Sequence, residues 1–208
     1  MTHVNPQAAD DNEPTDEESS AEPFDPATFD PATFDPEAVS VEDSELAAEV
    51  LDFWAATRQY AGMAKASIVV GQTVSETVPP QAWSFGDDPE LAEKLLGAVL
   101  AGDKTATSSA LWDYDDEGAP LPMVGELSIL LDGDGHPRAL IRTTSVETTT
   151  FEEVDEDFAA AEGEGDRTLE SWRADHEEFW RRNLGEGREF TQDMPVVCER
   201  FKLLYPRL

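Results

Sequence analysis

Apolar residues recur at helical spacing in three stretches of the chain. The first stretch covers residues 44–62, and Ser44 can cap its start. The second has Pro89 in its first turn and meets Gly102 where a left-handed residue is favoured. The third begins at Thr168 and ends near Gly185. The spacing predicts three helices, and the first is amphipathic through these side chains: Leu46, Val50, Phe53, Trp54 and Ala61.

Shorter runs of apolar residues predict strands. Leu127–Leu131 and Ala139–Val146 flank an Asp-Gly-Asp-Gly sequence, which predicts a tight antiparallel hairpin. Val196–Leu204 alternates apolar and polar residues and predicts a closing strand, and the residues after Gly102 form an extended exit from the second helix. Short strands interleaved with helices through local connections predict an α+β domain, built around a small β-barrel with flanking helices.

The chain changes character before the first helix. No Lys or Arg precedes Arg58, and acidic and small residues dominate the opening segment, so it cannot bury enough apolar area to offset its ordering entropy. We therefore expect a disordered acidic tail over residues 1–42. FDPAT occurs there at 24–28 and 29–33, followed by FDPEA, either as a docking motif with Phe anchors or as a product of replication slippage. An amphipathic helix and linker at 43–82 then lead into a folded domain at 83–208.

The charge of the chain excludes one class of function. The 208 residues contain 14 Lys and Arg against 46 Asp and Glu, which gives a formal charge of −32 and an isoelectric point near 4.1. Residues 83–208 alone carry 12 Lys and Arg and 29 Asp and Glu, a formal charge of −17. This opposes loose binding to polyanions, so we do not expect a protein that coats DNA, RNA or anionic lipid.

Location and cofactors follow from what the sequence lacks. No apolar run approaches the roughly 20 residues of a membrane span, and the first residues carry neither a basic region nor an apolar stretch. We therefore expect a cytoplasmic protein without a membrane partner. Cys198 is the single cysteine, and His3, His136 and His176 lack the spacing of a zinc site. We expect neither a metal nor a cofactor.

The segment after the second helix combines an amine with several hydroxyls. A period of two places Thr105, Thr107 and Ser109 on one side of the extended exit; alternatively, a turn lets Lys104 approach Thr107. A lysine beside a hydroxyl forms a nucleophile pair if burial lowers the amine pKa toward neutrality, whereas nearby carboxylates raise that pKa. The alternative is structural, with Thr and Ser suiting a strand and Lys104 exposed.

A second candidate is the acidic loop Glu162-Gly163-Glu164-Gly165-Asp166. One of its carboxyl groups could act as a general acid. Alternatively, these charges favour the N-terminus of the helix that Thr168 opens, through its macrodipole.

Several separately placed motifs resemble the ASCH domain family, a branch of the PUA-like superfamily. They lie within residues 83–205 and occur in the order typical of one subgroup: Trp83-Ser84-Phe85-Gly86, Leu100-Ala101-Gly102-Asp103-Lys104-Thr105-Ala106-Thr107, Pro120-Leu121-Pro122 with Gly125, and Ala161-Glu162-Gly163-Glu164-Gly165-Asp166 running into Leu169-Glu170 and Trp172-Arg173 with His176. The resemblance implies a small β-barrel with flanking helices and a cleft lined by the Gly-x-Lys motif.

The resemblance also implies RNA-related tasks. Family members are associated with RNA binding or ribonuclease activity, and a small bacterial member removes the acetyl group from acetylated cytidine. In that amidohydrolase a lysine of Gly-x-Lys is the base, a threonine three residues later is the nucleophile, and a glutamate before the second helix is the proton donor. By motif these roles correspond to Lys104, Thr107 and Glu164, with Glu162 as an alternative donor.

Three functions therefore remain open. The first is a metal-independent amidohydrolase acting on N4-acetylcytidine-like nucleosides, with Lys104 neutral in a desolvated cleft; a nucleoside carries no phosphate for the acidic domain to repel. The second is a module that binds structured RNA through a positive pocket of Lys104, Arg142 and Arg173. The third is a metal-independent ribonuclease that uses the same lysine. The candidate binding residues are Trp83, which could stack on a base, and Thr105, Arg142, Glu162 and Arg173.

Overall fold

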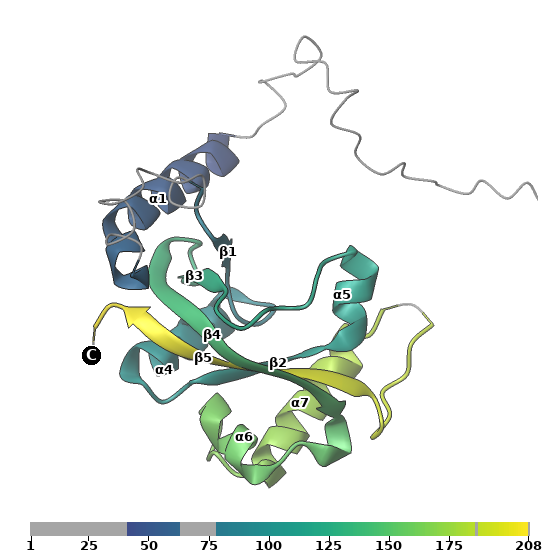
Figure 1. Ribbon diagram of the computed structural model, residues 1–208. Coiled ribbons are helices and arrows are strands. Elements are labelled where there is room, and N and C mark those ends of the chain that lie inside the picture. The colour runs from purple at the N-terminus through teal and green to yellow at the C-terminus, as the bar shows by residue number, and fades with distance from the viewer. Residues whose placement is uncertain (1–40, 63–77, 186, 208) are drawn as a thin grey trace, which may run out of the picture. The chain divides into compact units, whose positions relative to one another are not determined.

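The computed structural model describes residues 41–62, 78–185 and 187–207. All but the last two residues of the predicted acidic tail, with its FDPAT repeats, and most of the predicted linker lie outside the described residues. The helices and strands follow one another along the chain as labelled in Figure 1: α1 (Val41–Thr57), the 3-10 helix η2 (Arg58–Ala61), β1 (Gln81–Trp83), α4 (Pro89–Ala101), β2 (Ala106–Ala110), α5 (Leu111–Glu117), β3 (Leu127–Leu131), β4 (Pro137–Thr150), the 3-10 helix η4 (Phe151–Glu153), α6 (Glu156–Glu162), α7 (Leu169–Asn183) and β5 (Pro195–Tyr205).

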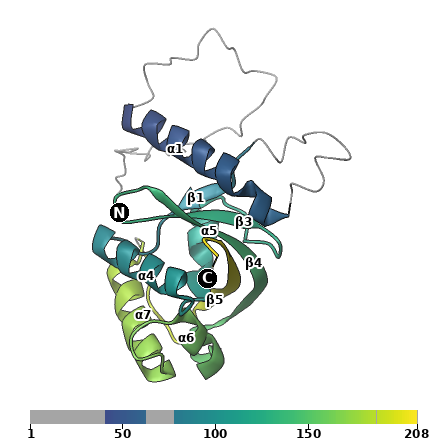
Figure 2. The ribbon, with the colours of Figure 1, turned by 90° about the vertical axis from the view of Figure 1, so that its left-hand side faces the viewer.

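The strands form one sheet in the order β1-β3-β4-β5-β2. Figure 2 shows how the sheet curls. Strand β1 pairs with β3 in parallel, and the other neighbours are antiparallel. The predicted hairpin is β3–β4, and the predicted closing strand is β5, which lies between β4 and β2. The sheet forms a half-barrel with helices around it, which confirms the predicted α+β class and the predicted barrel-like sheet with flanking helices.

Local capping signals set the ends of the two long helices near the site. Asp88 accepts a hydrogen bond from the backbone of Leu91 at the start of α4, and Gly102 ends that helix with a φ of 80°. Thr168 caps α7 by accepting from the backbone of Ser171, as its position before the helix predicts. Both predicted starts are confirmed.

Apolar packing fixes α4 and α7 against different parts of the sheet. One core cluster joins α4 to the sheet through these side chains: Leu95, Leu96, Val99, Leu130, Ile141 and Phe201. Another joins α6 and α7 to β2 and the start of β5 through these: Ala106, Ala110, Phe158, Trp172, Trp180 and Val196. The two helices therefore cover neighbouring regions of the sheet (Figure 2), and the Gly-x-Lys segment leaves α4 toward β2.

Helix α1 differs in detail from its prediction. It begins at Val41, so Ser44 lies inside the helix instead of capping it. Trp54 is only 2% exposed and packs with β3 and β4, whereas Leu46 is 36% exposed and lies outside that core. The helix therefore covers the end of the sheet away from α6 and α7 (Figure 1). None of the helices in the described segments is both long and apolar enough to span a bilayer.

Two short helices, α5 and α6, were not predicted. Helix α6 is seven residues long, and Asp155 caps it by accepting a hydrogen bond of 2.7 Å from the backbone of Phe158. The buried Phe158 and Ala159 pack in the same cluster as Trp172. Tertiary packing therefore holds a helix that is too short to show a clear periodicity. Its last residue is Glu162, which the sequence assigned to a loop.

Candidate functional site

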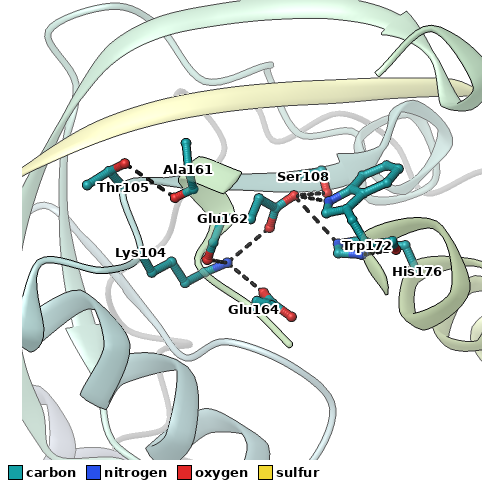
Figure 3. A network of polar contacts seen from close by, with 8 residues as sticks. All are labelled: Lys104, Thr105, Ser108, Ala161, Glu162, Glu164, Trp172 and His176. Carbon is teal, nitrogen blue, oxygen red and sulfur yellow. Dashed lines mark hydrogen bonds and ion pairs between the residues drawn. The ribbon is translucent and has the colours of Figure 1, made fainter. Parts of the chain in front are cut away.

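Lys104 is a buried cation held by two glutamates (Figure 3). Its side chain is 1% exposed, and Nζ donates to Glu162 Oε2 at 3.0 Å and to Glu164 Oε1 at 2.6 Å. A longer contact of 3.3 Å reaches the backbone carbonyl of Glu162, and the ring of Phe85 lies 5.2 Å from Nζ. These three oxygens match the three donors of an ammonium group.

Backbone contacts bring the lysine segment against the acidic loop. The Thr105 amide donates to the carbonyl of Ala161 at 2.7 Å, which joins the exit from α4 to the end of α6. Gly163 has a φ of 71°, and a Cβ there would overlap the backbone carbonyl of Asp103. A glycine is therefore required both for the turn and for the close approach of the two segments.

Glu162 is the centre of a hydrogen-bond network (Figure 3). The side chain is 1% exposed, and Oε1 accepts from Ser108 Oγ at 2.6 Å and from Trp172 Nε1 at 2.8 Å. His176 Nε2 lies 3.5 Å from the same oxygen. Burial raises the pKa of Glu162, but Lys104 above all, with His176 and the two hydrogen bonds, holds that pKa below its ordinary value. Glu162 is therefore ionised and positions its neighbours.

Glu164 is the more accessible carboxyl group of the loop. Its side chain is 21% exposed, and it contacts Lys104 through one carboxylate oxygen, Oε1. The two glutamates that the sequence left as alternatives are thus distinguished by burial and by hydrogen bonding. Both carboxyl groups pair with Lys104 and line the same cavity, but Glu162 also accepts from Ser108 and Trp172 and is buried, whereas Glu164 is the more exposed of the two.

Lys104 is protonated here, whereas the nucleophile pair predicted from the sequence requires a neutral amine. Burial lowers its pKa, as expected for a desolvated amine, but Glu162 and Glu164 outweigh burial and raise that pKa above its ordinary value. Lys104 is therefore an ammonium in this state of the protein. A neutral Lys104 requires that a proton leave for one of its partners.

Two adjoining cavities of about 300 Å³ each lie beside this network. We call the first the helix cavity, because α4 and α7 supply much of its wall; its polar lining includes these residues: Lys94, Glu162, Glu164, Asp175, His176 and Arg182. We call the second the sheet cavity, because all five strands line it through these residues: Gln81, Trp83, Thr107, Ser109, Ser128, Thr143 and Glu199. Phe85, Gly86, Thr107 and Ser108 line both cavities.

Thr107 lies in β2 where the two cavities adjoin. Successive side chains alternate across a strand, so Thr107 and Ser109 face away from Ser108, which bonds Glu162. In the antiparallel register Thr107 lies opposite Glu199 of β5, and Ser109 Oγ is 2.8 Å from the hydroxyl of Tyr114. The half-buried Thr107 is therefore reachable from both cavities.

The structure does not bring all the predicted binding residues to the cavities. Trp83 lines the sheet cavity, whereas Thr105 is exposed and its hydroxyl donates to the Ala161 carbonyl at 3.3 Å. Arg142 and Arg173 line neither cavity. Arg142 donates to the carbonyl of Ala61, and Arg173 donates to the carbonyl of Glu152, each at 2.7 Å. The positive pocket predicted from these arginines and Lys104 is not assembled, because each charge has a partner elsewhere.

Sequence reasoning missed two polar residues of the site. Ser108 contacts Glu162, and Glu199 lies in the sheet cavity. Strand alternation in β2 could have placed Ser108 on the other face of the strand from Thr107. Glu199 is the first charged residue of the predicted strand Val196–Leu204. No group of three or more His, Cys, Asp or Glu side chains suited to a metal ion occurs within residues 41–62, 78–185 and 187–207.

Comparison with known proteins agrees with this architecture. A family model for the ASCH domain matches residues 81–205. A solved ASCH domain from Lactobacillus crispatus is 37% identical, with a TM-score of 0.60, and the match covers 71% of this chain and 91% of that one. A solved protein from Enterococcus faecalis is 34% identical, with a TM-score of 0.63, and the match covers 76% and 91%. Comparison with curated proteins gave no match. The resemblance seen in the motifs is confirmed, and the chain belongs to the ASCH domain family.

Proposed function

We propose that this protein is an amidohydrolase that removes the acetyl group from N4-acetylcytidine-like nucleosides, with Thr107 as nucleophile. One observation carries the proposal. Thr107 lies at the junction of two cavities, and one of these cavities is lined by Glu164, which is paired with the buried Lys104. This arrangement combines a hydroxyl, a proton-exchanging pair and space for a small ligand.

The Lys104–Glu164 pair supplies the acid and the base of the reaction. In the resting state the proton is on Lys104, and its transfer over 2.6 Å to Glu164 gives a neutral amine and a carboxylic acid. A ligand in the helix cavity removes water from Glu164 and thereby favours the uncharged form of the pair. Glu162, ionised and held by Ser108 and Trp172, keeps the amine oriented throughout.

Acyl transfer then follows with a balanced set of protons. The step requires that substrate binding bring the Thr107 hydroxyl within hydrogen-bond distance of Lys104 Nζ. The neutral amine then takes the hydroxyl proton while the Thr107 oxygen attacks the amide carbonyl carbon. Glu164 donates its proton to the leaving exocyclic nitrogen, the carbon–nitrogen bond breaks, and an acetyl ester remains on Thr107. Water then adds its oxygen to the ester carbonyl and gives a proton to Glu164. Lys104 returns its proton to Thr107, and acetic acid leaves.

The charge of the domain supports a small, phosphate-free substrate. Residues 83–208 carry a formal charge of −17, which repels long polyanions but not a neutral nucleoside. The helix cavity has a mixed lining, with Lys94 and Arg182 beside Glu164, Asp175 and Glu178. A nucleoside therefore suits the site better than a long RNA does.

The test is acetate release from N4-acetylcytidine by the full chain. Thr107→Ala removes the nucleophile and should abolish release, Thr107→Ser should retain part of it, and Glu164→Gln should lower kcat by about 10²- to 10⁴-fold. Thr148→Ala is the matched control, because Thr148 is an exposed threonine of β4 that lines neither cavity. Circular dichroism establishes that each variant is folded.

Two results would overturn the proposal. A folded wild-type protein that releases no acetate would remove the amidohydrolase function, and a salt-dependent titration with structured RNA would then test the RNA-binding alternative. Full activity in Thr107→Ala would show that Thr107 is not the nucleophile. Release that persists in a chelator is the expected result for a reaction carried by Thr107, Lys104 and Glu164.

A further inference from the structure

The sheet cavity contains a buried carboxyl group that the proposed chemistry does not use. Glu199 lies on β5 between Cys198 and Arg200 and is 9% exposed. Its Oε1 accepts a hydrogen bond of 2.6 Å from the Thr143 hydroxyl. Within the described part of the chain, Glu199 has no cationic partner, and Thr143 is its hydrogen-bond partner. Its second oxygen is therefore available to a ligand in the cavity that Glu199 lines.

The surroundings of Glu199 favour its uncharged form. Burial raises the pKa of Glu199 above its ordinary value, the hydrogen bond from Thr143 opposes this rise, and the charge of Glu126 adds to it. Glu126 and the phenol of Tyr114 are the other titratable groups that line the cavity. When protonated on Oε2, this carboxyl group presents one donor and one acceptor side by side, since Thr143 leaves a lone pair on Oε1.

The size and the aromatic lining of the cavity suit a flat ring. Its volume is about 300 Å³, and Trp83, Phe85 and Tyr114 line it together with Pro120 and Pro122. Aromatic faces stack on bases without regard to their hydrogen-bonding edges, so an additional polar group is needed to select one edge. Glu199 is such a group, because it is buried and lines the same cavity as the aromatic side chains.

The strand register places Glu199 next to the proposed nucleophile. Thr107 and Glu199 lie directly opposite each other in the β2–β5 pair. The Cβ atoms of residues in that relation are roughly 4.5–5.5 Å apart. A ring whose edge is bound by Glu199 therefore presents its exocyclic group to the Thr107 hydroxyl.

We propose that Glu199 recognises the base of the substrate by pairing its carboxylic acid with a ring nitrogen acceptor and the adjacent exocyclic N–H. In cytosine these groups are N3 and the hydrogen on N4. The O–H of Glu199 donates to N3, and Oε1 accepts from the N4 hydrogen. The assignment rests on the proposed function for the position of the scissile bond, whereas recognition of the base itself needs no turnover.

The test is a binding titration of the full chain with cytidine, the product of the proposed reaction, over the range of pH in which cytidine is uncharged. Wild-type affinity should be constant at low pH and fall about tenfold per pH unit once pH exceeds the pKa of Glu199. Glu199→Gln keeps a donor beside an acceptor, so it should bind cytidine with an affinity independent of pH. Glu199→Leu should bind at least tenfold more weakly at low pH.

A second ligand and a matched variant make the test specific. N4,N4-dimethylcytidine lacks the exocyclic hydrogen and should bind the wild-type protein at least tenfold more weakly than cytidine does. Glu147→Gln removes an exposed carboxyl group of β4 that lies outside the sheet cavity, and it should leave the affinity and its pH profile unchanged.

The outcomes separate this inference from the proposed function. Cytidine binding with the expected pH dependence, together with no acetate release, would retain base recognition by Glu199 and remove the amidohydrolase function. Acetate release, together with equal cytidine affinity in wild type and Glu199→Leu, would retain the amidohydrolase function and remove base recognition by Glu199. A wild-type affinity that does not change with pH, or equal affinity for the dimethylated ligand, would also overturn the role of Glu199.

Discussion

Replacing Lys104 by Met should destabilise the protein far more than replacing a surface charge. The substitution keeps much of the volume of the buried side chain but removes the ammonium group that contacts Glu162 and Glu164. Glu164 is 21% exposed and can be hydrated, whereas Glu162 is 1% exposed and keeps its charge in the interior. The uncompensated charge of Glu162 is thus the main consequence of the change.

The expected loss follows from that burial. Removing one partner of a buried ion pair costs about 3–5 kcal/mol of the free energy of unfolding, because the remaining charge is neither hydrated nor paired. For a chain of this size the melting temperature falls by roughly 2–4 °C for each kcal/mol, so the decrease should be roughly 6–20 °C. Ser108 and Trp172 still donate to Glu162, which favours the lower part of this range.

The assay is urea unfolding followed by tryptophan fluorescence at neutral and acidic pH. With Lys104 removed, burial becomes the dominant influence on Glu162 and its pKa rises, so the difference from wild type should narrow as pH falls. Adding Glu162→Gln to Lys104→Met removes the unpaired charge, and the double variant should be more stable than the sum of the single effects by about 0.5–3 kcal/mol.

A surface pair provides the matched control. Glu177→Gln breaks the exposed pair with Arg181 and should cost only about 0.3–0.5 kcal/mol. The reasoning fails if Lys104→Met costs no more than this control, or if the double variant is simply additive. Either result would mean that Lys104 and Glu162 are not coupled as a buried pair.

Three further predictions concern other residues. Folding raises the pKa of Glu199, so the stability linked to its proton is present at low pH and is lost as pH rises through the folded-state pKa. The free energy of unfolding of Glu199→Gln should therefore increase relative to that of wild type as pH rises. A difference in urea unfolding that stays constant with pH would contradict this. Gly163→Ala and Gly135→Ala should each lower the free energy of unfolding by about 1–2 kcal/mol, because both glycines have a positive φ. Gly163→Ala should lose more, because a Cβ there overlaps the carbonyl of Asp103. Equal losses in melting experiments would count against that overlap. Burial raises the pKa of the Cys198 thiol to about 12, so a thiol reagent at pH 8 should label it only on unfolding, and rapid labelling of the folded protein would refute the burial argument.

The elements that could be predicted from the sequence are those with local causes. Pro89 and Gly102 bound α4, and Thr168 caps α7, because capping depends on residues within one turn of the helix. The β3–β4 hairpin was predictable from the Asp-Gly-Asp-Gly connection for the same reason. Helix α6 was not predictable, since its seven residues depend on contacts of Phe158 with α7 and the sheet.

The sequence by itself identified Lys104, Thr107 and the Glu162–Glu164 loop as candidates, because residue types and motif order are visible in one dimension. Only the tertiary structure decided their states. Lys104 is charged because the fold places two carboxylates, 58 and 60 residues away in the sequence, against its buried amine. Glu162 is more buried than Glu164 and has more hydrogen bonds, because Ser108 of β2 and Trp172 of α7 contact it.

Tertiary contacts also decided the roles of Arg142, Arg173 and Glu199. Arg142 and Arg173 suggested a positive pocket by their charge alone, but each guanidinium group bonds a backbone carbonyl at a distance in the sequence that no motif encodes. Glu199 carried no signal beyond being charged, as Arg200 and Lys202 of the same strand also are, and pairing with β2 placed it opposite Thr107. A pKa and a binding edge depend on which groups meet in space, and that meeting is decided by strand register and helix packing.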